Sequence, residues 1–468
     1  MSKDTKTDYD PEGITHTPSH VGEVLEDKAV EHDAVFGAIT EDGPNYRNVG
    51  WLGTTALMMK TQIGLGVLSM PVVFDTLGIV PGIIMLLVIA GITTWSDFMV
   101  GVFKLRHRHV YGIDDVGQML FGRIGYEIFG AMYALFFTFV SGSAMLSISI
   151  ALNALSTHAV CTAVFVAVAA IATFMFSSIQ TLGRISWVAW VGAGCIIVAV
   201  FVVTIAVGLQ DRPSAAPSDL GEWKSDYKIV AHPSFTEAMS AISTLVFTYA
   251  GTPAFFNIVA EMRDPRLYTR ALTVCQVSVT IVYIIVGIIV YYFCGSYVAS
   301  PALGSAGPTI KKVGYGIALP GLMASAILLS HLPAKHIFVR ILRGSKHLTA
   351  NTAIHWITWL GSTFSVSLVA YLIASGIPVF GGLVSLIGAL LGTFLAFQPM
   401  GCMWLYDHWK DERTVRWHLM VGWSVFVIVS GTFLMIAGTY SSIVGIIDSY
   451  KADGGSAAWS CADNSNST

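Results

Sequence analysis

The first long apolar segment of the chain contains the stretch Met58-Met59-Lys60-Thr61-Gln62-Ile63-Gly64-Leu65-Gly66-Val67-Leu68-Ser69-Met70-Pro71. A helix that only crosses lipid has little use for a lysine, two closely spaced glycines and a proline. Glycine weakens a helix, proline interrupts it, and a lysine at bilayer depth is costly. The N–H and C=O groups that a break sets free must face protein or a water-lined cavity. The stretch therefore predicts a functional site inside a membrane span.

The composition of the whole chain indicates a membrane protein. Of 468 residues, 54% are hydrophobic and 12% are charged, with a mean hydropathy of +0.67. Soluble domains carry roughly twice that charged fraction. Several apolar runs approach or exceed the roughly 20 residues that span a bilayer as a helix. The formal net charge of -3 gives no basis for expecting a nucleic acid partner. We expect an all-α integral membrane protein with the lipid bilayer as its surroundings.

The chain divides into a polar tail, a membrane domain and a short second tail. Residues 1–48 hold eleven acidic and four basic residues with little apolar periodicity, which predicts a disordered cytoplasmic tail. Residues 49–446 form the predicted transmembrane domain, and residues 447–468 a short extracellular tail. We expect eleven spans, at about 51–74, 79–103, 126–154, 159–178, 185–208, 236–260, 271–296, 313–334, 353–375, 379–404 and 419–446.

The distribution of basic residues predicts the orientation of these spans. With the N-terminus inside, fifteen lysines and arginines fall in cytoplasmic segments and six in outer ones, which fits the positive-inside rule. We therefore expect a cytoplasmic N-terminus and an extracellular C-terminus. The fifteen are Lys104, Arg106, Arg108, Arg123, Arg184, Arg263, Arg266, Arg270, Lys335, Arg340, Arg343, Lys346, Lys410, Arg413 and Arg416.

The sixth span repeats the interruption of the first. Its stretch Phe247-Thr248-Tyr249-Ala250-Gly251-Thr252-Pro253-Ala254-Phe255-Phe256-Asn257 again places small residues and a proline inside an apolar helix. Spans 1 and 6 cross the membrane in opposite directions. Matched interruptions in two inverted halves are a sequence pointer to the binding site of a secondary transporter. The alternative is that these residues only kink or pack membrane helices, where Gly and Pro are common.

Both stretches resemble one transporter family. Lys60 through Pro71 resembles the G-x-G-x-L-x-x-P signature of the amino acid/auxin permease family, and Asn257 through Pro265 its N-x-x-x-E-M-x-x-P ending. Within that family the chain is most similar to fungal permeases for neutral aliphatic and aromatic amino acids. The resemblance implies a leucine-transporter-like fold, with spans 1–5 and 6–10 as inverted repeats plus span 11. It also implies proton-coupled uptake of amino acids.

An amino acid zwitterion needs partners for both of its charged ends, because stripping either of water is costly. The backbone N–H groups of Gly64, Leu65 and Gly66 lie before a half-helix N-terminus, where an anion is favoured, and they suit the carboxylate. Carbonyls near both breaks suit the ammonium, and aromatic walls without a counter-charge suit a neutral side chain. The predicted substrate-binding residues are Thr61, Gln62, Ile63, Gly64, Leu65, Gly66, Phe247, Thr248, Tyr249, Gly251, Thr252 and Ser141, with Tyr133, Phe137 and Phe255 as further wall residues.

Six residues are candidates for gating or coupling. Lys60 and Asp97 lie at similar depth in sequential spans, so a Lys60–Asp97 pair is geometrically possible. In the functional interpretation Lys60 replaces a coupling cation or titrates during transport, and in the structural one the two form a static ion pair. Snorkelling of both side chains is the other structural interpretation. Glu261 is either half of an inner gate or a solvated helix end. His331 is a candidate proton relay, and Ser325 and Ser330 are candidate hydroxyl ligands; packing is the alternative for these three.

The six cysteines contain no CxxC pair, so no metal or redox centre is expected. A Cys294–Cys461 bridge outside the membrane is a weaker prediction. No nucleotide loop, zinc spacing or nucleophile elbow is present, which argues against an enzyme. No cofactor is predicted beyond a coupling ion.

The sequence thus predicts a plasma-membrane symporter that imports neutral amino acids with H+. A sodium-coupled or vacuolar carrier of the same fold is the first alternative, and an amino acid sensor is the second. The expected partners are a small amino acid and the bilayer, and the oligomeric state is left open.

Overall fold

The computed structural model describes residues 31–33, 37–39, 48–179, 182–213, 216, 223–348, 350–452, 459 and 461–465. In residues 31–33, 37–39, 182–186, 450 and 452 only the backbone is described. Most of the predicted tail at 1–48 lies outside the described residues. Within it, β1 (Glu31–Asp33) and β2 (Gly37–Ile39) pair as a short antiparallel hairpin.

The described helices follow the eleven predicted spans. Ten are long and apolar enough to cross a bilayer, and α5 is a shorter apolar helix of 16 residues between two of them. The third span begins earlier than predicted, since helix continues through a kink at Gly122. The single-helix spans are α3 (Ile79–Arg106), α4 (Ile113–Ser156), α5 (Thr162–Ser177), α6 (Leu182–Leu209), α9 (Tyr268–Cys294), α10 (Pro308–Leu342), α11 (Ala353–Gly376) and α15 (Val415–Ala452).

Three spans are broken into shorter helices. These are the first, the sixth and the tenth, and the first two are the spans in which the sequence predicted breaks. Short connecting helices are η2 (Pro265–Leu267), η3 (Gly295–Tyr297) and η4 (Ala302–Ser305). The broken spans consist of α1 (Trp51–Ile63), η1 (Val67–Ser69) and α2 (Met70–Leu77); of α7 (Phe235–Thr248) and α8 (Thr252–Ala260); and of α12 (Phe380–Ile387), η5 (Gly388–Gly392), α13 (Thr393–Ala396) and α14 (Gln398–His408).

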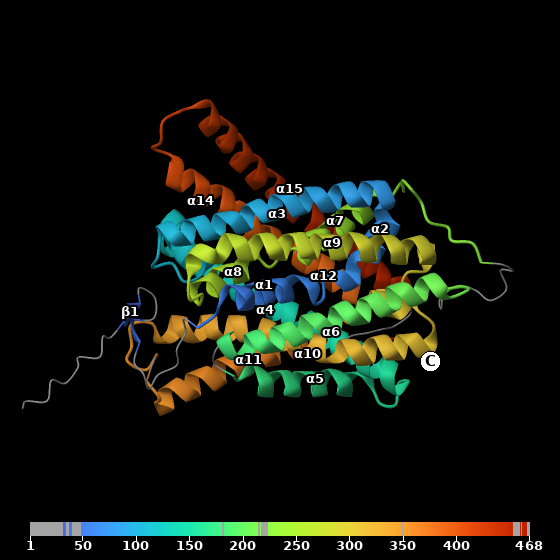
Figure 1. Cartoon of the computed structure of the whole chain (residues 1–468). Helices are drawn as coiled ribbons and strands as arrows, with labels where there is room; N and C mark the ends of the chain where they lie inside the picture. Colours follow the sequence, from blue (N-terminus) through green and yellow to red (C-terminus); the bar gives the residue numbers. More distant parts are fainter. Residues whose placement is uncertain are drawn as a thin grey trace, which may run out of the picture.

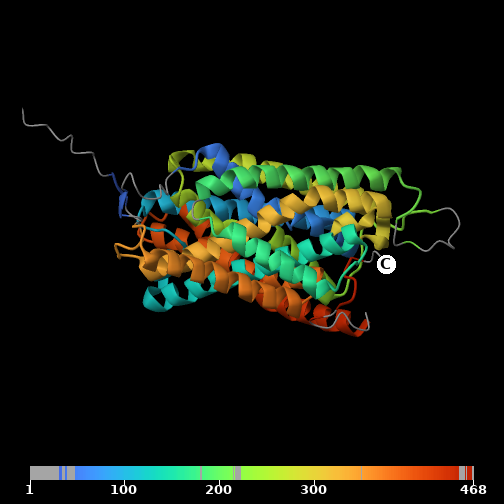
Figure 2. The same cartoon turned by 90° about the horizontal axis from the view of Figure 1, so that it is seen from below.

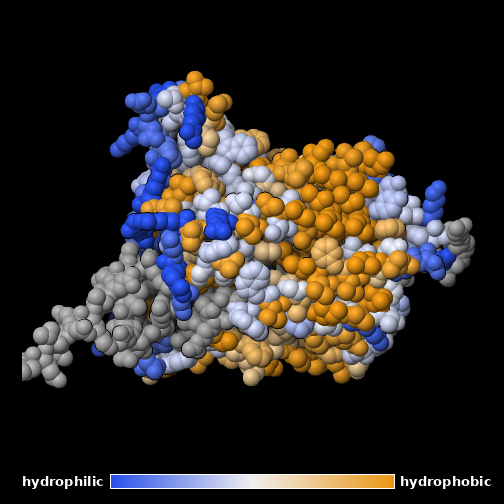
Figure 3. Space-filling view, viewed as in Figure 1, coloured by the Kyte–Doolittle hydropathy of each residue, from blue (hydrophilic) through white to orange (hydrophobic). Residues whose placement is uncertain are grey.

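The helices lie side by side along one axis and give the molecule two ends (Figures 1 and 2). We name one the basic end, because Arg106, Lys335 and Arg343 lie there, and the other the disulfide end, because Cys161 and Cys461 lie there. Apolar side chains form a broad belt across the middle of the surface, and polar ones gather toward the ends (Figure 3). This is the surface that a bilayer requires.

The two spans with predicted breaks form the centre of the bundle. The most apolar window of Phe235–Ala260 is completely buried and that of Trp51–Leu77 is 89% buried, whereas only 17% of the α15 window is buried. Lipid-facing helices therefore surround spans 1 and 6. Any backbone groups freed by the breaks face protein or an internal cavity, as the sequence analysis required.

The disulfide joins Cys161 to Cys461, so the predicted Cys294–Cys461 bridge is wrong. Cys294 is a buried free thiol at the end of α9. Residues 461–465 lie beside the start of α5, where the Thr162 hydroxyl donates to the carbonyl of Ala462 at 2.6 Å. This contact accompanies the pairing of Cys461 with Cys161.

Candidate functional site

The first span stops being α-helical at the glycines. α1 ends at Ile63, Gly64 to Gly66 form a turn, and helix resumes through η1 into α2. Pro71 stands in the first turn of α2, where its missing N–H removes no helical hydrogen bond. The predicted break is thus confirmed.

The second break has the same design. α7 ends at Thr248, a turn covers Tyr249 to Gly251, and α8 begins at Thr252 with Pro253 in its first turn. Every residue from Thr248 to Ala260 is buried. The two breaks therefore lie inside the protein and not against lipid.

Tyr283 of α9 connects the two breaks. Its hydroxyl lies 2.8 Å from the Gln62 carbonyl oxygen and 2.9 Å from the Thr248 carbonyl oxygen. A hydroxyl has one proton, so the two carbonyls share a single donor. Sequence reasoning missed this residue, because a tyrosine in an apolar helix of an aromatic-rich chain gives no signal of its own.

The glycines allow this close approach. A Cβ atom on Gly66 would lie 2.6 Å from the Tyr283 hydroxyl, 2.8 Å from the Gln62 carbonyl oxygen and 3.0 Å from the Thr248 Cα. A Cβ on Gly251 would lie 2.6 Å from the Thr61 hydroxyl oxygen. Because the atoms around Gly66 include backbone, that position requires glycine, whereas a side chain at Gly251 would have to displace the side chains of Thr61 and Phe255. The structure thus brings the residues predicted around the two breaks into one cluster.

One polar side chain in this cluster has unused hydrogen-bonding capacity. Neither the amide nitrogen nor the amide oxygen of Gln62 has a partner among the described residues, and the side chain is 1% exposed. The buried Thr252 hydroxyl lies beside the Asp97 carboxylate. Buried polar groups are normally paired, so each such group calls for an explanation such as a ligand.

The predicted wall residues point in several directions. The Tyr249 hydroxyl bonds to that of Thr280 at 3.0 Å, and its ring packs edge-on against Tyr283 at 5.3 Å. Phe247 instead lies against Gly388, at the start of the π-helical η5. Tyr133 packs against Phe137 on α4, with ring centroids 4.8 Å apart. Ile63, Leu65 and Phe255 belong to the apolar core.

The predicted serines lie on two helices. Ser141 of α4 bonds Ser330 of α10 at 2.5 Å, which links these helices. Ser325 donates to the Gly321 carbonyl at 3.2 Å and lies next to Gly64, where a Cβ would collide with its hydroxyl. Ser325 therefore adjoins the first break, whereas Ser141 and Ser330 are occupied with each other.

The predicted Lys60–Asp97 pair is wrong. One Asp97 carboxylate oxygen accepts a hydrogen bond from the Gln276 amide, and the Tyr268 hydroxyl donates to the Asp97 carbonyl at 2.8 Å. Lys60 lies on another face of α1, where a Cβ on Gly192 of α6 would be 3.1 Å from its Cε. Similar depth in sequential spans does not place two side chains on facing sides.

Lys60 is fully buried, so it does not snorkel to the surface either. It is 1% exposed, and its amine has no hydrogen-bond partner among the described residues. Its neighbours come from α6 and α10, whose Ala324 methyl also borders Gly192. An unpaired amine at this depth is costly, and such residues in membrane spans mark functional positions.

At the basic end, Glu261 forms an ion pair with Lys335 of α10, whose side chain is 3% exposed. The backbone beside it is tied to the start of α1, since the Val49 N–H donates to the Glu261 carbonyl at 3.2 Å and the Arg263 N–H to the Val49 carbonyl at 2.9 Å. The basic end is thus closed between α8, α10 and the segment before α1. From the sequence, Lys335 was assigned to a cytoplasmic loop. The one local signal that it belongs to a buried site is its position two residues after Pro333, inside α10.

His331 is buried one turn before Lys335 in α10. Its ring packs against Trp359 of α11 with centroids 5.3 Å apart, and it lies beside the backbone of Ser177 and Ile179 at the end of α5.

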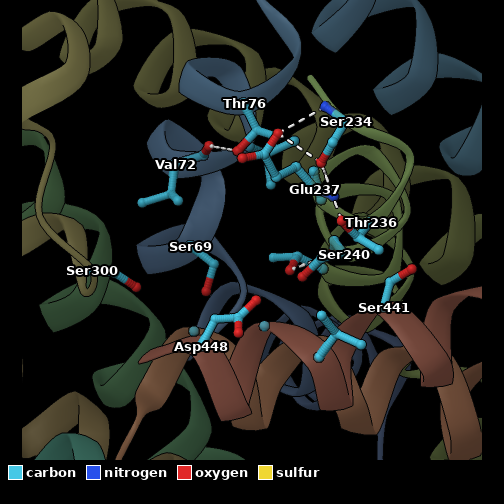
Figure 4. A pocket seen from close by; sticks show the side chains of 16 residues that line it. Ser69, Val72, Thr76, Ser234, Thr236, Glu237, Ser240, Ser300, Ser441 and Asp448 are labelled. Atoms are coloured by element: carbon cyan, nitrogen blue, oxygen red, sulfur yellow. Dashed lines mark hydrogen bonds between the residues drawn. The ribbon is translucent and has the colours of Figure 1, made fainter. Parts of the chain in front are cut away.

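Toward the disulfide end, a cavity of about 480 Å³ lies between α2, α7 and α15 (Figure 4). Its inner wall includes Ser69 and Thr244, which lie three residues after Gly66 and four residues before Thr248. The broken region is therefore covered at the basic end and adjoins a cavity on the other side.

Comparison with known proteins places the chain among amino acid transporters. Residues 47–444 match the family described as transmembrane amino acid transporter protein. A transmembrane transporter of Fusarium pseudograminearum is 32% identical over 426 residues, which are 91% of this chain and 89% of that protein. The N amino acid transport system protein of Neurospora crassa is 29% identical over an alignment of 471 positions that covers 97% of this chain and 97% of that protein.

Two solved structures share the fold. A substrate-bound, outward-open Na+-coupled sialic acid symporter covers 86% of this chain and 92% of its own, with a TM-score of 0.54 and 12% identity. The structure of MhsT in complex with L-phenylalanine aligns with 85% of this chain over 98% of its own length, with a TM-score of 0.52 and 14% identity. Both broken spans and nearly the whole membrane domain fall within the family match, and the chain therefore belongs to the transmembrane amino acid transporter family.

Proposed function

We propose that the protein is a secondary active symporter that imports neutral aliphatic and aromatic amino acids together with protons. The substrate would bind between the two breaks, and access would alternate between the two ends of the bundle. In this arrangement the N-terminus is cytoplasmic, the C-terminus is extracellular and the membrane is the plasma membrane, as the distribution of basic residues favours.

The observation that carries the proposal is the cluster of the two breaks around Tyr283. Backbone groups from oppositely directed half-helices meet there, and the adjacent Gln62 amide lacks a partner among the described residues. Such groups can hold a carboxylate at one half-helix and an ammonium at carbonyls of the other. The family membership and the amino acid named for the MhsT structure support the same substrate class.

The position of Lys60 favours H+ over Na+ as the coupling ion. Its amine belongs to a buried side chain that lies among α1, α6 and α10 and borders Gly192, which also borders Ala324. An ammonium there repels a second cation, whereas an amine without a counter-charge can exchange a proton as water reaches it. Lys60 would then serve as the coupling group.

Uptake into proteoliposomes tests this function. With purified protein, labelled phenylalanine should accumulate under an inward proton gradient, and a protonophore should abolish the accumulation. A sodium gradient at equal pH on both sides should have no effect. Accumulation driven by sodium alone would establish the sodium-coupled alternative.

Lys60→Met separates coupling from binding. We expect this variant to exchange external for internal phenylalanine at a near-normal rate. A proton gradient should not drive it to accumulate phenylalanine. Lys312→Met is the matched control, because Lys312 is an exposed lysine at the disulfide end. Gradient-driven accumulation by Lys60→Met at the wild-type level would overturn the assignment.

A further inference from the structure

The cavity at the disulfide end has a chemical bias of its own. Eight of its sixteen described lining residues carry a hydroxyl, two are acidic, and none of the sixteen is basic. The acids are Glu237 at the start of α7 and Asp448 near the end of α15, and both are exposed at the mouth. Figure 4 shows them on different sides of the cavity.

Three of the eight hydroxyls present acceptors rather than donors to the cavity. Thr76, Thr244 and Ser441 each donate their proton to the carbonyl four residues earlier in their own helix, at 3.0, 3.1 and 2.8 Å. A hydroxyl that donates its single proton in this way offers only lone pairs to a ligand. The part of the wall formed by these three residues is therefore suited to a group rich in N–H donors and offers no hydroxyl donor to a carboxylate.

Ser69 supplies an independent indication of a ligand. It is 2% exposed, its hydroxyl has no hydrogen-bond partner in the described part of the protein, and it borders the cavity. Figure 4 shows its side chain and that of Asp448 directed into the same space. A buried hydroxyl is normally paired, so a ligand that forms a hydrogen bond with Ser69 would satisfy it, and the Ser69 lone pairs can accept from an ammonium.

The acids at the mouth are only weakly neutralised. Lys451 lies 3.5 Å from Asp448, but both side chains are largely exposed, at 73% and 64%. Exposed pairs of this kind are screened by water and contribute little. Glu237 accepts hydrogen bonds from the N–H and the hydroxyl of Ser234. These neutral donors fix the position of the carboxylate and do not neutralise its charge.

We propose that this cavity is a second binding site, one that receives the ammonium group of a small organic molecule before it reaches the breaks. This inference rests on the proposed function, because the natural ligand of the site would be the incoming amino acid. An amino acid would enter with its ammonium toward Ser69 and its carboxylate toward water. The site would also discriminate against substrates with an acidic side chain.

Phenethylamine is a suitable probe, because it has the ammonium and the aromatic ring but no carboxylate for the first break. Its counterpart is 3-phenylpropionate, which has the carboxylate and no ammonium. Binding is measured as the shift in unfolding midpoint of the full-length purified protein over a concentration series, a readout that does not depend on transport. We expect phenethylamine to stabilise the wild-type protein with a lower dissociation constant than 3-phenylpropionate.

The combined variant Glu237→Gln with Asp448→Asn should raise the dissociation constant for phenethylamine about fivefold, the scale of exposed charge contacts. Glutamine at position 237 keeps the capping box with Ser234. Ser69→Ala should weaken phenethylamine binding without changing any charge. Asp211→Asn is the control, because Asp211 is an exposed acid at the same end that does not line the cavity.

Unchanged phenethylamine binding in both the double variant and Ser69→Ala would overturn the proposal. Equal weakening by Asp211→Asn would also overturn it, because it would show a general surface-charge effect. If wild-type protein fails to take up phenylalanine while the variants still weaken phenethylamine binding, the proposed function fails and this site stands.

Discussion

The two halves of the bundle differ in how they are closed. At the basic end, a buried ion pair and backbone hydrogen bonds join α8 and α10 to the segment before α1. At the disulfide end, the same central spans border a cavity with an exposed acidic mouth. The broken spans are thus covered at one end and border a cavity at the other. The proposed alternating access requires such a difference between the two ends.

Breaking the buried pair at the basic end should have the largest effect. Lys335→Met leaves the Glu261 carboxylate buried without its cation, which costs about 3–5 kcal/mol. We expect the backbone from residue 260 to 268 to lose protection by about that amount in hydrogen exchange. The double variant Glu261→Gln with Lys335→Met should recover most of it.

The exposed pair Arg340–Glu127 is the matched control, since its Glu127 side chain is 60% exposed. Glu127→Gln should change protection by at most about 1 kcal/mol. If Lys335→Met behaved like Glu127→Gln, the buried pair would not be what holds the basic end closed.

Gly66→Ala should have the next largest effect. The added methyl group would separate the first break from Tyr283 and Thr248. A displacement of about 1 Å at a binding site can lower the rate about a hundredfold, and we expect uptake to fall on that scale. Gly91→Ala is the control, because Gly91 is exposed on α3 with no atom within 4 Å of its Cβ position. If Gly66→Ala took up substrate at the wild-type rate, the assignment of Gly66 to the binding site would be wrong.

Tyr283→Phe tests the link between the breaks with a smaller change. It leaves two buried carbonyls without their shared donor, at a cost of about 1–3 kcal/mol. We expect kcat/KM for uptake to fall about tenfold, since 1.4 kcal/mol corresponds to a factor of ten. Tyr292→Phe on the same helix, at a tyrosine that is 43% exposed, should be neutral. Equal values for the two variants would mean that Tyr283 only packs.

Cys161→Ser should have the smallest effect. The bridge ties the C-terminal segment to the start of α5, away from both breaks. We expect a lower unfolding midpoint and an uptake rate within about twofold of wild type, since disulfides stabilise mainly by constraining the unfolded chain. A loss of uptake as large as that of Gly66→Ala would show that the C-terminal segment takes part in transport.

Much of the fold was predictable from local chemistry. Apolar length located the spans, and Gly66, Pro71, Gly251 and Pro253 located the two breaks, because these residues act on their own stretch of backbone. Side-chain partners were less predictable, since they depend on how each helix is rotated. The rotation of α1 directs Lys60 toward α6, and Asp97 of α3 accepts a hydrogen bond from Gln276 instead.

Partners contributed by a third helix were the hardest to predict. Tyr283 is one of 17 tyrosines, and Lys335 was one of fifteen basic residues assigned to loops. Tyr283 has no local pattern that distinguishes it from its neighbours, and the one local signal for Lys335 is its position two residues after Pro333. The choice of Cys294 for the bridge failed for the same reason, because Cys461 lies beside the start of α5.

The central claim is that backbone groups of the two breaks hold both charged ends of an amino acid. Equilibrium binding of labelled phenylalanine to purified protein, with competition by its methyl ester and by its N-acetyl form, tests this most directly. The account predicts that unlabelled phenylalanine competes fully and that each blocked compound competes at least about a hundredfold more weakly, since each leaves buried polar groups unpaired. Competition by either blocked compound at the strength of phenylalanine would contradict it.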